Sequence, residues 1–236
     1  MLTWTDVDFF YKKQKIFSKI NLELSRDKNY LLVGPNGMGK STFIKLAMGY
    51  IQPQAGKIIR NFSKFNYVPP NNHLHPCLKV SDLIDLYIDQ KQKFYSSKTY
   101  KTLDIEDLDE QSYLSNLSSG QRQRLLLALS LVRPSEMDFF DEPTNHLDYY
   151  YKNQFYMDLN LRKSCKLLVC HDLQSALQIK NSHILLVDKK GVLDLGPSDE
   201  ALLSPQLQNA FRIKVSINNN PVNGRKMLAI SNYETR

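Results

Sequence analysis

The fold of this chain is decided by one stretch of its sequence, Gly34-Pro35-Asn36-Gly37-Met38-Gly39-Lys40-Ser41-Thr42. An apolar run at residues 30–33 precedes it and is typical of a buried strand, and residues 41–48 have a helical pattern. The spacing G-x-x-x-x-G-K-[ST], placed where a strand turns into a helix, predicts a phosphate-binding loop. In such a loop backbone N–H groups face the phosphates, and the helix dipole adds partial positive charge.

The side chains of this loop suit a nucleoside triphosphate. Lys40 is expected to reach the β- and γ-phosphates, and the Ser41 hydroxyl is expected to ligate Mg²⁺. We therefore predict that this loop binds a nucleoside triphosphate together with Mg²⁺. The nucleotide-binding residues predicted here are Gly34, Pro35, Asn36, Gly37, Gly39, Lys40, Ser41 and Thr42.

Length and composition are those of one large α/β domain with a substantial core. The chain has 236 residues, of which 42% are hydrophobic and 23% are charged. No apolar stretch approaches the roughly 20 residues that a bilayer-spanning helix needs. The first residues have no basic segment followed by an apolar one, so we expect no signal peptide. Cys77, Cys165 and Cys170 lack metal-ligand spacing and leave an odd thiol, which indicates a reducing cytosol.

The formal net charge of +7 is spread along the chain. Basic residues are scattered and accompanied by acidic ones, and only the C-terminal extension, about residues 212–236, is mainly basic. We therefore expect no nucleic-acid partner, since such proteins gather their basic residues into a patch or stripe. A mildly basic surface near anionic headgroups or phosphates is the simpler interpretation.

The order of expected elements predicts an α/β fold with a mostly parallel core sheet. Alternating strands at residues 2–10 and 15–24 indicate an N-terminal antiparallel β subdomain. Further strands are expected at residues 57–60, 65–68, 137–140, 167–170 and 184–187. Residues from about 80 to 117 have a helical pattern and predict a short helical insert, after which a new helix begins at residues 118–120.

Two acidic residues, Asp141 and Glu142, follow the strand expected at residues 137–140. The C-terminal ends of strands in an α/β sheet meet the ligand crevice. There Asp141 can hold the hydration shell of Mg²⁺, and Glu142 can orient a water for in-line attack on the γ-phosphate. Two acids at a strand end are by themselves more often part of a solvated loop, but the phosphate loop upstream favours the catalytic interpretation.

Two further positions have both a structural and a functional interpretation. The helix start at residues 117–121 can bind a second anion through its N–H groups, or Ser118 and Ser119 can be simple N-caps. His171 follows the strand expected at residues 167–170 and can touch a γ-phosphate, although a lone histidine is more often structural. The residues alone leave these alternatives open.

The order of these motifs resembles the ATP-binding cassette (ABC) ATPase family over essentially the whole chain. The motifs are the phosphate loop, Leu117-Ser118-Ser119-Gly120-Gln121, Asp141-Glu142-Pro143-Thr144-Asn145-His146-Leu147-Asp148, and His171-Asp172. The resemblance implies a P-loop NTPase with a short helical ABC subdomain, the whole of residues 1–236 forming one nucleotide-binding domain. It assigns Ser118, Gly120 and Gln121 to the signature motif, which contacts the nucleotide held by the opposite subunit.

The same resemblance gives roles to other residues. It implies that Lys40, Glu142 and His171 are catalytic, with His171 as the switch histidine, and that Asp148 is the D-loop aspartate. Tyr11 stands where family members place an aromatic residue that stacks on adenine. A half-exposed tyrosine at a strand end is the structural alternative for Tyr11.

Two positions depart from the family pattern. The second signature glycine is Ser119 here, a small residue that is expected to preserve function. Family members usually read Tyr-Val-Pro-Gln after the early strands, whereas residues 67–70 read Tyr-Val-Pro-Pro, so Pro70 replaces the glutamine that touches Mg²⁺ and couples to the membrane subunit. We hypothesise that Asn71 or Asn72 supplies the missing amide oxygen.

The resemblance also implies partners. Two copies of the chain are expected to form a head-to-tail homodimer with ATP between them, and the helical insert is expected to grip an integral membrane permease. A substrate-binding protein is a further expected partner. The resemblance thus places the chain in the cytoplasm, on the inner face of the cell membrane.

Similarity favours one kind of ABC protein over others. Residues 56–69 resemble the ATPase subunits of zinc and manganese importers, and residues 203–207 and 224–228 resemble those of cobalamin, haem and iron-siderophore importers. We therefore predict import of a metal ion or metal chelate. The alternatives are an exporter of peptide, lipid or haem, a non-hydrolysing regulatory cassette, and a soluble ABC protein that acts on ribosomes or in cluster assembly.

Overall fold

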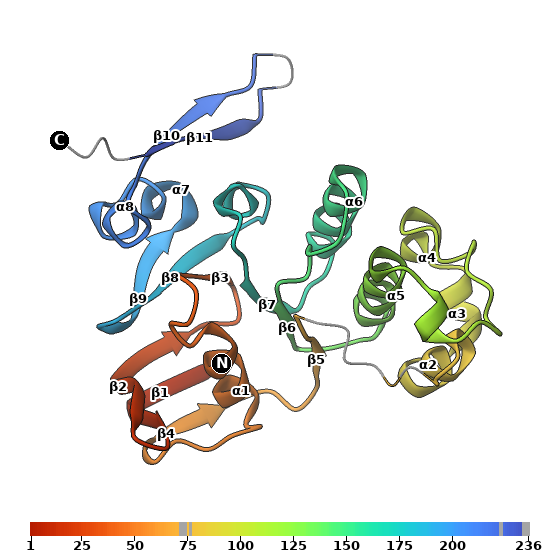
Figure 1. Cartoon of the computed structure of the whole chain (residues 1–236), viewed down its shortest axis with the longest axis horizontal. Coiled ribbons are helices and arrows are strands. Elements are labelled where there is room, and N and C mark those ends of the chain that lie inside the picture. The colour runs from red at the N-terminus through yellow and green to blue at the C-terminus, as the bar shows by residue number, and fades with distance from the viewer. Residues whose placement is uncertain (71–74, 76, 222–223, 233–236) are drawn as a thin grey trace. The chain divides into compact units, whose positions relative to one another are not determined.

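The computed structural model describes residues 1–70, 75, 77–221 and 224–232, and it divides the chain into two compact units (Figure 1). Unit 1 is made of Met1–Ser63 and Cys165–Arg236, and unit 2 is made of Lys64–Ser164. The chain is mixed α/β with mostly parallel core strands and an antiparallel β subdomain, as predicted. Within the described residues, no helix is both long and apolar enough to cross a membrane.

The antiparallel sheet of unit 1 is built from the N-terminal strands. Its strands are β1 (Leu2–Tyr11), β2 (Gln14–Leu24) and β4 (Ala55–Arg60), in the order β2-β1-β4. Buried residues alternate along β1 because one face of the sheet packs on the core. Asp6, with a φ of 48°, lies at a shift in the register between Trp4 and Val7, so that the buried face resumes at Val7.

The parallel strands of unit 1 lie next to one another although they are distant in the chain. These strands are β3 (Asn29–Val33), β7 (Cys165–Val169) and β8 (Ser182–Asp188). β3 pairs in parallel with both β7 and β8, and β9 (Gly191–Pro197) adds an antiparallel edge to β8. Strands buried on both faces have near-continuous apolar sequences, which explains the runs that the sequence showed.

One helix of unit 1, α1 (Lys40–Met48), is anchored to the antiparallel sheet by aromatic rings. The Trp4 and Phe43 rings stack with their centroids 4.4 Å apart and their planes at 3°. Phe17 meets Phe43 edge-on at 6.1 Å. All three side chains are buried, so the helix that begins at Lys40 has a defined place relative to β1 and β2.

The C-terminal part of unit 1 ends in a hairpin that the sequence did not predict. The elements here are η2 (Leu173–Leu177), α7 (Ser198–Ala201), α8 (Pro205–Phe211), β10 (Ile213–Asn219) and β11 (Lys226–Asn232). β10 and β11 pair antiparallel (Figure 1). The Leu228 N–H donates to Oε1 of Gln174 at 2.7 Å, and Lys226 forms an ion pair with Asp199, so β11 is attached to η2 and to α7.

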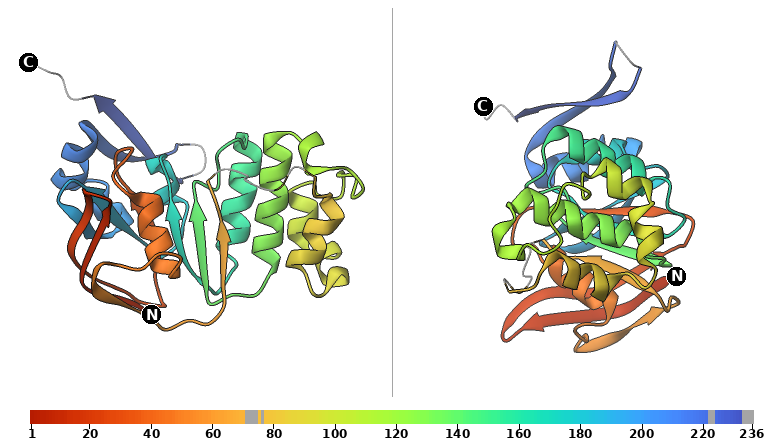
Figure 2. Two further views of the ribbon diagram at one scale, coloured as in Figure 1. Left: turned by 60° about the horizontal axis from the view of Figure 1, so that its bottom comes forward. Right: turned by 90° about the vertical axis from the view of Figure 1, so that its right-hand side faces the viewer.

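Unit 2 contains two parallel strands and most of the helices. Its elements are β5 (Phe65–Val68), α2 (Val80–Tyr87), α3 (Lys91–Tyr95), α4 (Lys98–Thr102), η1 (Leu114–Asn116), α5 (Ser119–Val132), β6 (Met137–Asp141) and α6 (Tyr149–Leu159). β5 pairs in parallel with β6. Helix α5 contacts α2, α4 and α6, and the helices are visible together in Figure 2. The long apolar face of α5, from Leu125 to Leu131, is therefore the core of this unit.

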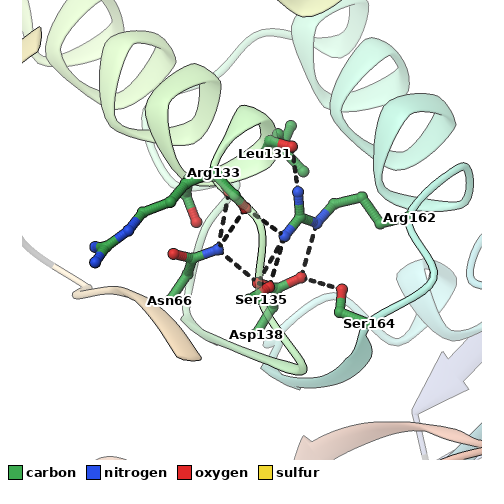
Figure 3. Close-up of polar contacts among 8 residues, drawn as sticks. Asn66, Leu131, Arg133, Ser135, Asp138, Arg162 and Ser164 are labelled. Carbon is green, nitrogen blue, oxygen red and sulfur yellow. Dashed lines mark hydrogen bonds and ion pairs between the residues drawn. The ribbon is translucent and has the colours of Figure 1, made fainter. Parts of the chain in front are cut away.

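A buried ion pair fixes the start of β6 in unit 2. Asp138 is fully buried and accepts from Nε of Arg162 at 2.8 Å and from Nη2 at 3.0 Å. Asn66, Ser135 and Ser164 also donate to its carboxylate (Figure 3). The Arg162 guanidinium in turn donates to backbone carbonyls at the end of α5. A buried charge is tolerated only with such partners, so this cluster, which we call the Asp138 cluster, ties α5, β6 and the end of α6 together.

Candidate active site

The predicted phosphate loop lies between β3 and α1 in unit 1, and its backbone requires glycine at two positions. Gly34 has a φ of 154°, and a Cβ placed on it would lie 2.1 Å from the carbonyl oxygen of Val187. Gly39 caps α1 with a φ of 96°, and its Cβ would lie 2.6 Å from a side-chain methyl of Ile16. Other residues clash at both positions, so the two glycines allow the loop to pass close to neighbouring strands.

Lys40 lies inside this loop. It is the first residue of α1, is 6% exposed, and donates from Nζ to the carbonyl oxygens of Gly34 at 2.8 Å and Pro35 at 3.1 Å. Ser41 is partly exposed and Thr42 is buried in the same first turn. One ammonium and the N-terminal end of a helix therefore share a small region, which is an arrangement that favours an anion.

The predicted acidic pair lies in unit 2, at the end of β6. Asp141 is the last residue of that strand and is fully buried, and Glu142 is partly exposed. The backbone of Glu142 has a φ of 55°, in the left-handed region that residues other than glycine seldom adopt. Nδ2 of Asn145 donates to Oε2 of Glu142 at 2.6 Å. The turn after β6 is thus held by a hydrogen bond between the side chains of Asn145 and Glu142.

The helix expected to begin at residues 118–120 is α5, and the predicted signature residues at its start also cap it. Oγ of Ser118 accepts from the Gln121 N–H at 3.2 Å, and Oε1 of Gln121 accepts from the Ser118 N–H at 2.8 Å. This reciprocal capping box is the structural role that the sequence left open for Ser118. A Cβ on Gly120 would lie 3.0 Å from the carbonyl oxygen of His146, so the helix start packs closely on the turn after Glu142.

Asp148 forms the N-cap of α6. Its Oδ1 accepts from the Tyr151 N–H at 3.1 Å. The Tyr151 hydroxyl donates to Asp104, and Arg124 lies over the Tyr151 ring, 4.2 Å from its centroid. The hydrogen bond to Asp104 and burial raise the pKa of Tyr151 above its ordinary value. These contacts join the predicted D-loop to the segment after α4 and to helix α5 within unit 2.

The remaining predicted site residues belong to unit 1 and are exposed. Tyr11 ends β1, is 45% exposed, and meets the ring of Phe9 edge-on at 4.9 Å. His171 is exposed and follows β7 by two residues. The adenine contact of Tyr11 and the phosphate contact of His171 stay predictions.

Of the sequence after β5 that departs from the family pattern, the structure describes Pro69 and Pro70. Tyr67 and Val68 end β5, and Pro69 and Pro70 come next. Residues 71 and 72, the asparagines proposed to replace the missing glutamine, lie outside the described residues.

Two polar residues near the acidic pair were not singled out from the sequence. Gln123 is 1% exposed and donates from Nε2 to the carbonyl oxygen of Pro143 at 2.7 Å. Asn145 holds Glu142, as described above. Gln123 stands among the polar residues that begin α5, so its burial had no signal in the sequence, whereas an asparagine three residues after a candidate base was a signal for Asn145.

Known proteins resemble this chain over most of its length. A family model described as ABC transporter matches residues 17–145. The zinc import ATP-binding protein ZnuC of Psychrobacter arcticus is 30% identical over 224 residues, which cover 89% of this chain and 89% of that protein. ABC transporter F family member 2 of Arabidopsis thaliana is 31% identical over 82% of this chain, but over only 29% of its own length.

A solved structure shows the same fold. The structure of an ATP binding subunit of an ABC transporter superposes with a TM-score of 0.75 at 21% identity, over 84% of this chain and 91% of that chain.

Proposed function

Because the chain belongs to the ABC transporter family, as an ATP-binding subunit with ATPase activity, we propose that it energises the import of a metal ion or metal chelate through a separate membrane permease. The observation that carries this proposal is the 30% identity to a zinc import ATP-binding protein over 89% of both chains. Further zinc import ATP-binding proteins match, among them one from Acinetobacter baylyi that is 36% identical over 70% of this chain.

The proposed reaction is hydrolysis of ATP by a directly attacking water. The Lys40 ammonium, now bonded to two carbonyls of its own loop, is the cation that binds the β- and γ-phosphates. Glu142 orients the water and takes its proton while the new P–O bond forms and the bond to the leaving ADP breaks. His171 contacts the γ-phosphate, and Tyr11 stacks on the adenine.

Ser41 and Asp141 are the residues that would hold Mg²⁺. Hydroxyl and carboxylate oxygens are the ligands that Mg²⁺ prefers, so the donor set fits the ion. Asp141 is fully buried, and buried carboxylates are commonly found beside a cation or another positive group. Bound Mg²⁺ would neutralise charge on the phosphate oxygens.

The proposed partners follow from the signature motif and the helical insert. Ser118, Gly120 and Gln121 are proposed to contact the ATP held by a second copy of the chain, which requires a homodimer. The short helices between Val80 and Asn116 are proposed to contact the permease at the inner face of the membrane. A substrate-binding protein is proposed to deliver the metal.

Metal accumulation in cells tests this function. The chromosomal copy is replaced with a Glu142→Gln variant, and cellular zinc, manganese, iron and cobalt are measured. We expect at least one of these metals to fall while potassium stays constant, because uptake loses its energy source. Unchanged contents of all four metals in cells that express the variant at the normal level would overturn the import proposal.

A soluble, non-transport ABC protein is the second candidate. Asn145-His146-Leu147-Asp148 resembles the ribosome-associated branch, and the chain is 31% identical to an ABC transporter F family member. Sedimentation of a cell extract distinguishes the two: the transporter subunit is expected with the membranes, whereas the second candidate is expected with ribosomes or in the supernatant.

A further inference from the structure

We infer that Asn145 is a positioning residue for ATP hydrolysis, because its side chain holds the carboxylate of Glu142 in place. The inference deepens the proposed function and rests on the role given there to Glu142. Both residues belong to unit 2.

Asn145 contacts Glu142 at two points. Nδ2 donates to the carboxylate oxygen Oε2 at 2.6 Å, and the backbone N–H donates to the carbonyl oxygen of Glu142 at 3.2 Å. An ionised carboxylate only accepts hydrogen bonds, so the NH₂ group of the amide must be the end that faces it. Hydrogen bonds to a charged acceptor are short and roughly twice as strong as neutral ones. The side-chain bond is therefore strong enough to select one orientation of Glu142.

Two residues of this turn have an unfavourable backbone conformation. Glu142 has a φ of 55° and His146 a φ of 66°, in the left-handed region that is unfavourable for residues other than glycine. A hydrogen bond from Nε2 of Gln123, in α5, to the carbonyl oxygen of Pro143 at 2.7 Å also supports the turn. Strained residues persist where the surroundings fix them, and they gather at functional sites.

The contact leaves the chemistry of Glu142 intact. A carboxylate has about four lone-pair sites on its two oxygens, so one oxygen can be held while the group still accepts from a water. A side chain fixed before the substrate arrives has less freedom to lose on reaching the transition state. We therefore expect Asn145 to affect the rate of the chemical step more than the binding of ATP.

A simpler role for Asn145 is to form the turn. Asparagine is common in turns because its side chain bonds to nearby backbone groups. Here the side chain bonds to the carboxylate of Glu142, and the backbone N–H of Asn145 makes the turn bond. A turn-forming role predicts a loss of stability, whereas a positioning role predicts a loss of kcat that requires Glu142.

A double-mutant cycle separates the two roles. ATP hydrolysis is measured for the full chain, for Asn145→Ala, for Glu142→Gln and for the double variant. We expect Asn145→Ala to lower kcat about tenfold, a part of the 10²–10⁴ that a general base contributes, and to change the KM for ATP by less than about twofold. In the Glu142→Gln background, Asn145→Ala should leave the residual kcat unchanged.

Two further variants complete the test. Asn145→Asp keeps the shape and replaces the donor with an acceptor, so its kcat should fall at least as far, and it serves in place of Asn145→Ala if that variant does not fold. Asn153→Ala removes a partly exposed asparagine that bonds to the carbonyl of Tyr149 in α6, and it should keep the original kcat.

The outcomes distinguish the inference from the function on which it rests. If Glu142→Gln hydrolyses ATP at the original rate, the role proposed for Glu142 is wrong. If Glu142→Gln is inactive but Asn145→Ala and Asn145→Asp keep the original kcat, or if Asn145→Ala lowers the residual rate equally in the Glu142→Gln background, Asn145 does not position Glu142.

Discussion

Nε2 of Gln123 donates to the carbonyl oxygen of Pro143 at 2.7 Å, from a side chain that is 1% exposed. This bond joins the helix that starts with the predicted signature residues to the turn that carries Glu142. By the family resemblance, the signature acts on the nucleotide of the partner subunit and Glu142 on that of its own. One buried hydrogen bond thus connects two elements that are proposed to serve different ATP molecules.

Replacing Gln123 with leucine is expected to destabilise the chain. The Pro143 carbonyl would lose this partner in a buried place, which typically costs about 1–3 kcal/mol. Urea denaturation measures the change in the free energy of unfolding. The matched control is Gln111→Leu, which removes an exposed bond from Lys79 and should stay within about 0.5 kcal/mol. A Gln123→Leu value as small as that of the control would contradict the role of this bond.

Removing the arginine of the Asp138 cluster should have a larger effect. Arg162→Met leaves the fully buried carboxylate of Asp138 without its cation, and such a change costs about 3–5 kcal/mol. The control is Lys91→Met, which breaks an exposed ion pair with Asp85 worth about 0–1 kcal/mol. Chemical denaturation measures how far each variant lowers the free energy of unfolding. Equal losses in the two variants would show that the Asp138 cluster does not stabilise β6.

Alanine substitutions at different glycines of the phosphate loop should lower the stability of the chain by different amounts. Gly37 has a φ of 78° with open space around its Cβ, so Gly37→Ala should cost only the backbone strain of about 1–2 kcal/mol. Gly34→Ala should cost more, because its Cβ would overlap the backbone of Val187 in β8. Thermal unfolding measures the difference, and an equal loss for the two variants would mean that the close approach at Gly34 does not matter.

Unit 2 should lose stability at high pH through Tyr95. Burial, followed by a hydrogen bond with Glu110, raises the pKa of Tyr95 from 10.0 to about 12. The folded chain therefore keeps this proton at a pH where the unfolded chain has released it, so the contribution is complete below pH 10 and is lost as the pH rises towards 12.

A tyrosine-to-phenylalanine comparison isolates this effect. The free energy of unfolding of the original chain should fall relative to that of Tyr95→Phe as the pH rises from 10 to about 12. Denaturation of both proteins at several pH values measures it. A difference that does not change over this interval would show that Tyr95 titrates alike in the folded and unfolded chains.

Local pattern was enough to predict the elements that carry the motifs. The strand expected at residues 65–68 is β5, and the helix expected at residues 41–48 is α1, which begins one residue earlier. Apolar runs and glycine positions are local signals, and they depend little on distant parts of the chain. The organisation of the chain as one domain with a helical insert at about residues 80–117 stays a prediction.

Long-range and weakly patterned features could not be predicted in the same way. The pairing of Asp138 with Arg162 joins residues that are far apart in the chain, and no local spacing indicates it. The hairpin of β10 and β11 was missed because its alternating apolar residues stand among serine and asparagine in a polar segment. The left-handed φ of Glu142 also depends on surrounding contacts rather than on its residue type.

The most direct test of the whole account compares ATP binding with ATP hydrolysis in the same protein. Calorimetric titration with Mg²⁺ and ATP, followed by phosphate release, is carried out on the original chain and on Glu142→Gln. We expect both proteins to bind ATP with similar affinity and only the original chain to release phosphate at a catalytic rate. Phosphate release by Glu142→Gln at the original rate, or failure of the folded original chain to bind ATP, would contradict the account.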